Sequence, residues 1–246
     1  MKRPVVKART KLVGLIAVLT CSELLALGQS RLDTAGDLVS EGSFEKAKAM
    51  LRHAIAADPN NADTRVLLGT TLAVQGIRGE AIERLAAAVR LNPNSASAHN
   101  EFGALSRFVE VKAAGEEFER VLELDPALAE AHVNLSLVLE QAGEFAAAGE
   151  HLDHAIELQG SSPKGAYTHY LRAKIWGAQD HIDNSIDELQ KALSLNPDYE
   201  EAWSDLGGMR RLNLDNAGAI EALQRAVTLK PDDAIAQYRL GQLYLD

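Results

Sequence analysis

Apolar positions along most of the chain recur at the three-to-four-residue spacing of amphipathic helices, and the helical stretches are short. The second helix of each predicted pair ends in a similar phrase, such as Ala-Val-Arg-Leu-Asn before Pro93. Because proline cannot continue a helix, each phrase predicts a helix end. The prolines after Pro4 are 34, 33, 37, 34 and 34 residues apart, at Pro59, Pro93, Pro126, Pro163, Pro197 and Pro231. The pattern therefore predicts a unit of two helices that is repeated along the chain.

Small and large residues recur at fixed places within this unit. The predicted first helices carry a large residue followed by glycine, at Leu68-Gly69, Phe102-Gly103, Leu206-Gly207 and Leu240-Gly241. The predicted second helices pair an alanine with a larger residue, at Ala47/Leu51, Ala81/Leu85, Ala114/Phe118, Ala148/Leu152 and Ala219/Leu223. A glycine on one helix lets its partner approach closely. Each fully buried large side chain contributes about 1.5–3 kcal/mol.

With Trp203 and Tyr244 in the aromatic positions, the unit resembles the tetratricopeptide repeat, a helix–turn–helix repeat of about 34 residues. The resemblance covers residues 29–246 and implies an all-α fold. The expected architecture is an α-solenoid wound as a right-handed superhelix, with first helices on its concave face and second helices outside. The expected repeats are 29–61, 62–95, 96–128, 129–165, 166–199 and 200–233, followed by a half repeat at 234–246.

Several positions depart from the repeat pattern. His99, His132 and His169 stand where the family has tryptophan, and we expect them to pack against the neighbouring helix. The third unit is one residue short near residues 108–111. Four first helices should end at residues with a left-handed backbone conformation, at Gly42, Gly76, Gly143 and Asp180. Helix N-caps are expected at Asn61, Ser95 and Asp198.

The first thirty residues have the character of a targeting segment. Five basic residues precede the apolar run of residues 12–21, which is too short to span a bilayer core of about 20 residues. Ala26-Leu27-Gly28 offers a small-x-small cleavage site, so we expect a signal peptide at 1–28 and an exported, periplasmic or cell-envelope protein. Two alternatives stay open: lipid modification of Cys21, as in a lipoprotein, and an uncleaved N-terminal anchor at residues 12–27.

Composition narrows the classes of function. The chain has 46% hydrophobic and 24% charged residues, which is typical of a folded protein. Its net charge of −10 argues against nucleic acid as a partner. Its single cysteine excludes an intramolecular disulfide framework and a cysteine-based zinc site.

Catalytic arrangements are scarce in the sequence. His151 and His154 share one turn of a predicted second helix, but no third metal ligand is evident, and we interpret them as outer-face residues. Neither a glycine-rich phosphate loop nor a nucleophile elbow is present. We therefore expect no catalytic residues, no metal and no cofactor, and a protein that is not an enzyme.

What remains is binding. The resemblance implies a non-catalytic scaffold that holds a peptide or partner protein in its concave groove. The alternative is an N-terminal docking arm, or fragment, of a larger multidomain protein or assembly factor. By helical phase, the groove residues are expected to be Asn100, Glu101, Arg107, Asn134, Tyr167, Tyr170, Lys174 and Arg211, with Glu140, Ser204 and Asp205 on the same face. We expect the two tyrosines to carry little of the core.

The chain ends in half a unit. Leu240, Gly241 and Tyr244 occupy packing positions of the repeat, yet no second helix follows them. Part of this helix should then leave apolar surface in water. We expect either that the protein continues beyond Asp246 or that the helix caps the array and docks on a partner or a second copy. In both cases residues 234–246 should fray first and favour self-association.

Overall fold

The computed structural model describes residues 32–245, and throughout this range the regular structure is helical. The expected signal segment at 1–28 lies outside the described residues. The chain divides into two compact units, residues 1–59 and 60–246, which we describe separately.

The described part of the first unit is a helical hairpin. Residues 32–40 form one helix, and α2 spans Phe44–Ala57. Gly42 joins them with a φ of 75°, a left-handed conformation that glycine adopts without steric cost. Ala35, Ala47 and Leu51 are buried.

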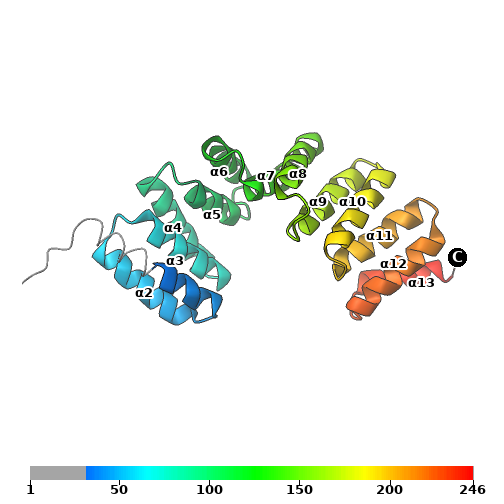
Figure 1. Ribbon diagram of the computed structural model, residues 1–246, viewed down its shortest axis with the longest axis horizontal. Helices are drawn as coiled ribbons and strands as arrows, with labels where there is room; N and C mark the ends of the chain where they lie inside the picture. The colour runs from blue at the N-terminus through cyan, green and yellow to red at the C-terminus, as the bar shows by residue number, and fades with distance from the viewer. Residues whose placement is uncertain (1–31, 246) are drawn as a thin grey trace, which may run out of the picture. The chain divides into compact units, whose positions relative to one another are not determined.

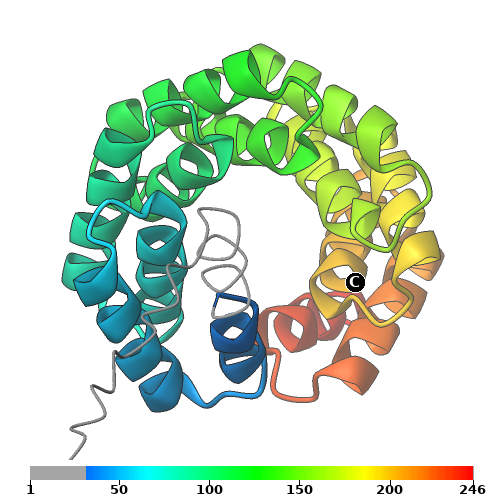
Figure 2. The ribbon, with the colours of Figure 1, turned by 60° about the vertical axis from the view of Figure 1, so that its left-hand side comes forward.

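The second unit is a stack of helix pairs (Figure 1). Its helices are α3 Ala62–Val74, α4 Arg78–Leu91, α5 Ala96–Ser106, α6 Val111–Leu124, α7 Ala129–Ala142, α8 Phe145–Gln159, α9 Gly165–Ala178, α10 Ile182–Leu195, α11 Glu200–Leu212, α12 Asn216–Leu229 and α13 Ala234–Leu243. Each helix packs against the next. Within this unit the first helices of the pairs form the inner layer and the second helices the outer layer (Figure 2). The expected all-α solenoid is confirmed.

Glycine is required where the two helices of a pair approach most closely. A Cβ on Gly207 would lie 2.5 Å from Cγ of Leu223 on α12, and one on Gly69 would lie 2.6 Å from Cγ of Leu85 on α4. In the fifth repeat, Ser185 of α10 takes the place of alanine and donates its hydroxyl to the carbonyl of Ala173 on α9, at 2.9 Å. The buried hydroxyl is thus satisfied within the pair.

All four left-handed residues expected after first helices, Gly42 included, are confirmed. Gly76 and Gly143 have φ of 77° and 79°, and Asp180 has φ of 61°. Leu214, which was not predicted, adopts the same left-handed conformation after α11, with φ of 62°. Leucine rarely adopts this conformation, and the Leu214 side chain is 89% exposed.

Two of the three expected N-caps are confirmed. The side chains of Asn61 and Ser95 accept hydrogen bonds from the backbone N–H groups of Thr64 and Ala98. The expectation for Asp198 is wrong, because Tyr199 occupies the N-cap position of α11 and makes no side-chain cap.

The histidines in the tryptophan position are buried, as expected, and each is also hydrogen-bonded. His99 and His132 place Nε2 3.0 and 3.1 Å from the carbonyl oxygens of the prolines six residues earlier. Trp203 donates from Nε1 to the carbonyl of Pro197 in the same way, at 2.8 Å. Histidine at this position can therefore make the same hydrogen bond to the proline carbonyl as tryptophan does.

Candidate functional site

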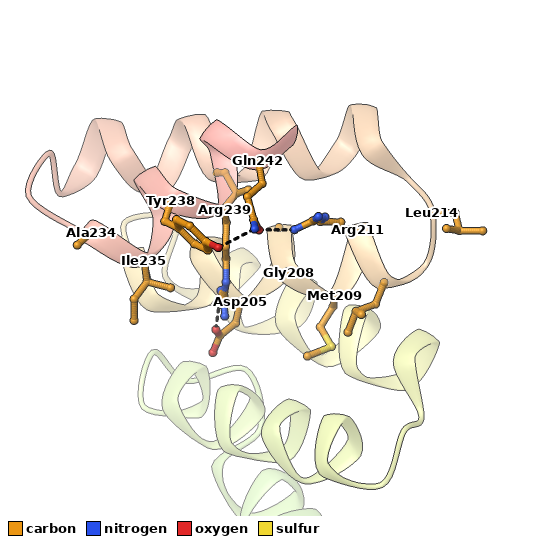
Figure 3. Close-up of a pocket in the computed structure, with 13 residues that line it drawn as sticks. Asp205, Gly208, Met209, Arg211, Leu214, Ala234, Ile235, Tyr238, Arg239 and Gln242 are labelled. Atoms are coloured by element: carbon orange, nitrogen blue, oxygen red, sulfur yellow. Dashed lines mark hydrogen bonds and ion pairs between the residues drawn. The ribbon is translucent and has the colours of Figure 1, made fainter. Parts of the chain in front are cut away.

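The inner face of α9, α11 and α13 is hollowed by two pockets. The larger, of about 840 Å³, lies between α11 and α13 (Figure 3) and is called the α11–α13 pocket below. The smaller, of about 220 Å³, lies between α9 and α11. Asp205 and Met209 of α11 line both pockets, so the two adjoin. A concave, largely apolar surface with a few polar groups is the usual form of a binding site.

Asp205 organises the polar side of this face. Its Oδ2 accepts the hydroxyl of Tyr170 at 3.1 Å, and its Oδ1 lies 3.3 Å from Nη1 of Arg239. The same Arg239 nitrogen donates to the backbone carbonyl of Ser204 at 2.9 Å. One carboxylate therefore holds α9, α11 and α13 together (Figure 3 shows its contact with Arg239).

A chain of hydrogen bonds crosses the mouth of the α11–α13 pocket (Figure 3). Arg211 donates from Nη1 to Oε1 of Gln242 at 2.6 Å, and Gln242 donates to the hydroxyl of Tyr238 at 2.8 Å. Tyr238 and Ile235 are 66% and 61% exposed. These two side chains thus present apolar surface beside donors and acceptors that are already fixed in position.

The structure separates the roles of the two tyrosines predicted for the groove. Tyr167 is 46% exposed and accessible. The expectation that Tyr170 carries little of the core is wrong, because its ring packs against the apolar clusters on both sides of α9 and lies 5.0 Å from the Tyr199 ring, centroid to centroid. Burial, and next the negative charge of Asp205, raise the pKa of Tyr170. Its hydroxyl therefore stays protonated and serves as a structural donor.

Lys174 and Arg211 both line pockets of this face. The ammonium of Lys174 lies 3.4 Å from Oε1 of Glu140 on α7, and the lysine is exposed beside the smaller pocket. Arg211 lines the α11–α13 pocket. The structure thus places Lys174 and Arg211, together with Tyr170, on one continuous inner surface.

The other four predicted residues lie nearer the N-terminal side of the second unit. Asn100 is only 4% exposed, and its Oδ1 accepts from Nδ2 of half-buried Asn134 at 3.1 Å. The expectation that Asn100 faces a partner is therefore wrong, because this amide pair links α5 to α7. Burial, and then the charge of Glu130, raise the pKa of half-buried Glu101. Arg107 follows the end of α5, with its guanidinium 5.1 Å from the Phe108 ring centroid, in the turn and not on the helical face.

Sequence reasoning missed the contribution of α13 to the site. Ile235, Tyr238, Arg239 and Gln242 line the α11–α13 pocket, although none of them was predicted. A signal was present: Arg239 lies 35 residues after Ser204 and Gln242 lies 31 after Arg211, about one repeat apart. Polar residues with complementary groups at this spacing identify contacts between consecutive first helices.

The described residues contain no group of three or more side chains suited to a metal ion. The histidine pair is less simple than expected: His154 is exposed on α8, but Nδ1 of half-buried His151 lies 2.9 Å from Nδ1 of His132 on α7. Across residues 32–245, none of the helices combines the length and the apolar character that crossing a membrane requires.

The tetratricopeptide repeat family matches residues 38–100 and 110–164, and a TPR repeat description matches residues 215–246. The chain belongs to the tetratricopeptide repeat family. Arrays of this family are typically non-catalytic scaffolds for other proteins.

The chain also resembles parts of longer curated proteins. The chain is 26% identical to human protein O-mannosyl-transferase TMTC1 over 203 residues, which is 82% of this chain and 19% of that protein. It spans between 11% and 40% of the curated relatives that it matches.

Solved structures agree on the fold. PilW, described as a widely conserved type IV pilus biogenesis factor, superposes with a TM-score of 0.79 at 16% identity, over 87% of this chain and 98% of PilW. YrrB, described as a TPR protein with an unusual peptide-binding site, gives a TM-score of 0.60 at 18% identity, over 76% of this chain and 96% of YrrB.

Proposed function

We propose that this array is a non-catalytic interaction scaffold that binds a peptide or a segment of a partner protein on the inner face of α9, α11 and α13. The observation that carries the proposal is the α11–α13 pocket. Its volume of about 840 Å³ falls in the range of ligand sites. Its exposed Tyr238 and Ile235 give a partner's apolar side chain a surface to cover.

The polar groups around the pocket favour an ordered partner backbone. Asp205, Arg211 and Gln242 are held by their own hydrogen bonds before any partner arrives. Preorganised donors and acceptors lower the entropy cost of binding. YrrB, a protein of the same fold, is described as having a peptide-binding site, which supports a peptide as the class of ligand.

The proposal is tested with Tyr238→Ala. Partners are first captured on the array at residues 29–246 and identified by mass spectrometry, and the dissociation constant of the purified partner is then measured by calorimetry. Loss of an aromatic anchor at an interface costs about 2 kcal/mol, so we expect affinity to fall about thirtyfold. Stability should change little, because Tyr238 is 66% exposed.

Phe108→Ala is the matched control, since this aromatic residue is also exposed, at 61%, but lies in the α5–α6 turn outside the pocket. Equal affinity of the wild-type protein and Tyr238→Ala would remove the pocket from the binding site. Sedimentation of the free array shows whether a second copy occupies this face, through self-association by the half repeat at 234–246. The exposed Ile235 and Tyr244 of that half repeat make it the competing occupant.

The lengths of the relatives favour a second candidate function. The array corresponds to 19% of TMTC1, so arrays of this kind also serve as parts of much larger proteins. On this hypothesis the chain is the docking arm of a multidomain protein or assembly factor. Sequencing the messenger RNA beyond the codon for Asp246 distinguishes the two, because a stop codon there excludes a C-terminal extension.

We further propose that the protein is exported. The basic residues before the apolar run at 12–21, and Ala26-Leu27-Gly28 after it, support cleavage that leaves Gln29 at the N-terminus. N-terminal sequencing of the protein from cell-envelope fractions should begin at Gln29. A lipid-modified Cys21 would move the processing site, and a retained Met1 in the membrane fraction would indicate an anchor.

A further inference from the structure

Three consecutive repeats place a buried histidine at the same contact between their two helices, but with different partners. Nδ1 of His99 lies 2.5 Å from Oε2 of Glu117, and Nδ1 of His169 lies 2.6 Å from Oε2 of Glu188. In the repeat between them, the residue that faces His132 is another histidine, His151. At this contact the α7–α8 pair thus differs from α5–α6 and α9–α10 by one change, from glutamate to histidine.

Hydrogen-bond chemistry fixes where the protons are in the His132–His151 contact. Nε2 of His132 faces the carbonyl of Pro126, which can only accept, so Nε2 carries a hydrogen. In the neutral pair, Nδ1 of His132 is then bare and accepts the N–H of His151 at 2.9 Å. One added proton is tolerated, because an imidazolium on one ring still donates to the bare nitrogen of the other. A second added proton turns two N–H groups and two positive charges toward each other.

The charged groups around the pair only partly offset this repulsion. The ring of His154 lies 5.4 Å from that of His132, centroid to centroid, and its charge opposes protonation of His151, while its own Nδ1 lies 3.8 Å from Oε2 of Glu157. Glu150 is the carboxylate of α8 that acts on His151. On α9, Arg172 is already paired with Asp153 at 2.7 Å, and on α6 Arg120 is paired with Glu123 at 2.7 Å, so each pair is neutral as a whole.

We propose that the His132–His151 contact is a proton-sensitive joint, which acid loosens while the His–Glu contacts of the two flanking repeats remain closed. In those repeats a doubly protonated histidine donates to the carboxylate, so acid keeps the contact in place. The joint lies in the middle of the stack, where α7 also contacts α5 through Asn134 and α9 through Glu140. The array therefore acquires one joint whose rigidity depends on pH.

The sign of the pH dependence follows from the histidine. Burial lowers the pKa of His151 below its usual 6.5, and the positive charges of His132 and His154 act in the same direction, while Glu150 opposes them. The folded chain thus holds this proton less tightly than the unfolded chain. The stability that the uncharged His151 contact contributes is therefore fully present above about pH 6.5. It is lost as the pH falls below that value. If the folded chain leaves His151 uncharged at pH 5.5 while the unfolded chain protonates it, the ratio of folded to unfolded protein falls by at most a factor of about ten.

Hydrogen exchange with mass spectrometry measures the joint directly, at pH 7.5 and 5.5, in the presence of EDTA to exclude metal ions and with correction for intrinsic exchange rates. Protection of α7 and α8 should fall between about threefold and tenfold in acid relative to α9 and α10. The matched variant is His151→Glu, which gives the middle repeat the side chain of its neighbours. In that variant the acid-induced loss should disappear or reverse.

His151→Gln removes one titrating group, so the protection of α7 and α8 should change little with pH in this variant. It tests the proposal even where His151→Glu fails to fold. His154→Gln keeps the pair and should retain most of the acid-induced loss. The proposal is overturned where the wild-type protein shows no selective loss in α7 and α8, or where His151→Gln shows the same loss as the wild-type protein.

Discussion

Replacing Phe118 with alanine should lower the free energy of unfolding by about 3–5 kcal/mol, the largest effect that we expect from a single substitution. Phe118 of α6 is fully buried and packs with Ala114, Leu135 and Val138, so it joins α6 to α7. Its ring also meets α5, since a Cβ on Gly103 would lie 2.9 Å from Cε1 of Phe118. Three helices therefore lose packing when the ring is removed.

Urea denaturation followed by circular dichroism measures this loss. Phe108→Ala is the matched control, because the same change is made ten positions away at a side chain that is 61% exposed. Exposed substitutions usually change stability by less than about 0.5 kcal/mol. Equal effects of the two substitutions would mean that α5, α6 and α7 do not share the cluster in solution.

The pairs of helices could be predicted from the sequence because the repeat states the same information several times. Proline, glycine and alanine positions each mark a helix end or a close contact, and they agree from unit to unit. Leu214 escaped prediction because its left-handed conformation has no glycine or asparagine to mark it. The predicted N-cap at Asp198 was wrong although aspartate is a good N-cap residue. Its carboxylate instead lies 3.2 Å from the guanidinium of Arg225.

The inner face could be predicted only by helical phase, which gives a direction and not a partner. Helical phase gives the direction in which Tyr170 and Asn100 point. It does not show the neighbours that bury them, which lie about one repeat away in the sequence. Tyr170 meets Asp205, 35 residues later, and Asn100 meets Asn134, 34 residues later. Such pairs hold consecutive first helices together, so the side chains that stay accessible are those without this role, including Tyr167 and Tyr238.

The close approach of α11 to α12 leads to the second large effect. Gly207→Ala adds a single methyl group, and its Cβ would lie 2.5 Å from Cγ and 2.9 Å from Cδ2 of Leu223. Leu223 is fully buried, and the backbone carbonyl of Ala219 would lie 3.2 Å away, so neither side can yield cheaply. Overpacking of this kind costs about 1–3 kcal/mol, although alanine is the better helix former by about 1 kcal/mol.

Gly241→Ala separates the packing cost from helix propensity. Gly241 occupies the same slot of the repeat in α13, but a Cβ there would meet nothing within 4 Å. The substitution should therefore stabilise α13 by about 0.5–1 kcal/mol. Thermal unfolding of the two variants beside the wild-type protein should show shifts of opposite sign. Destabilisation by Gly241→Ala as large as that by Gly207→Ala would mean that a second helix, from a partner or another copy, packs on α13 in solution as α12 packs on α11.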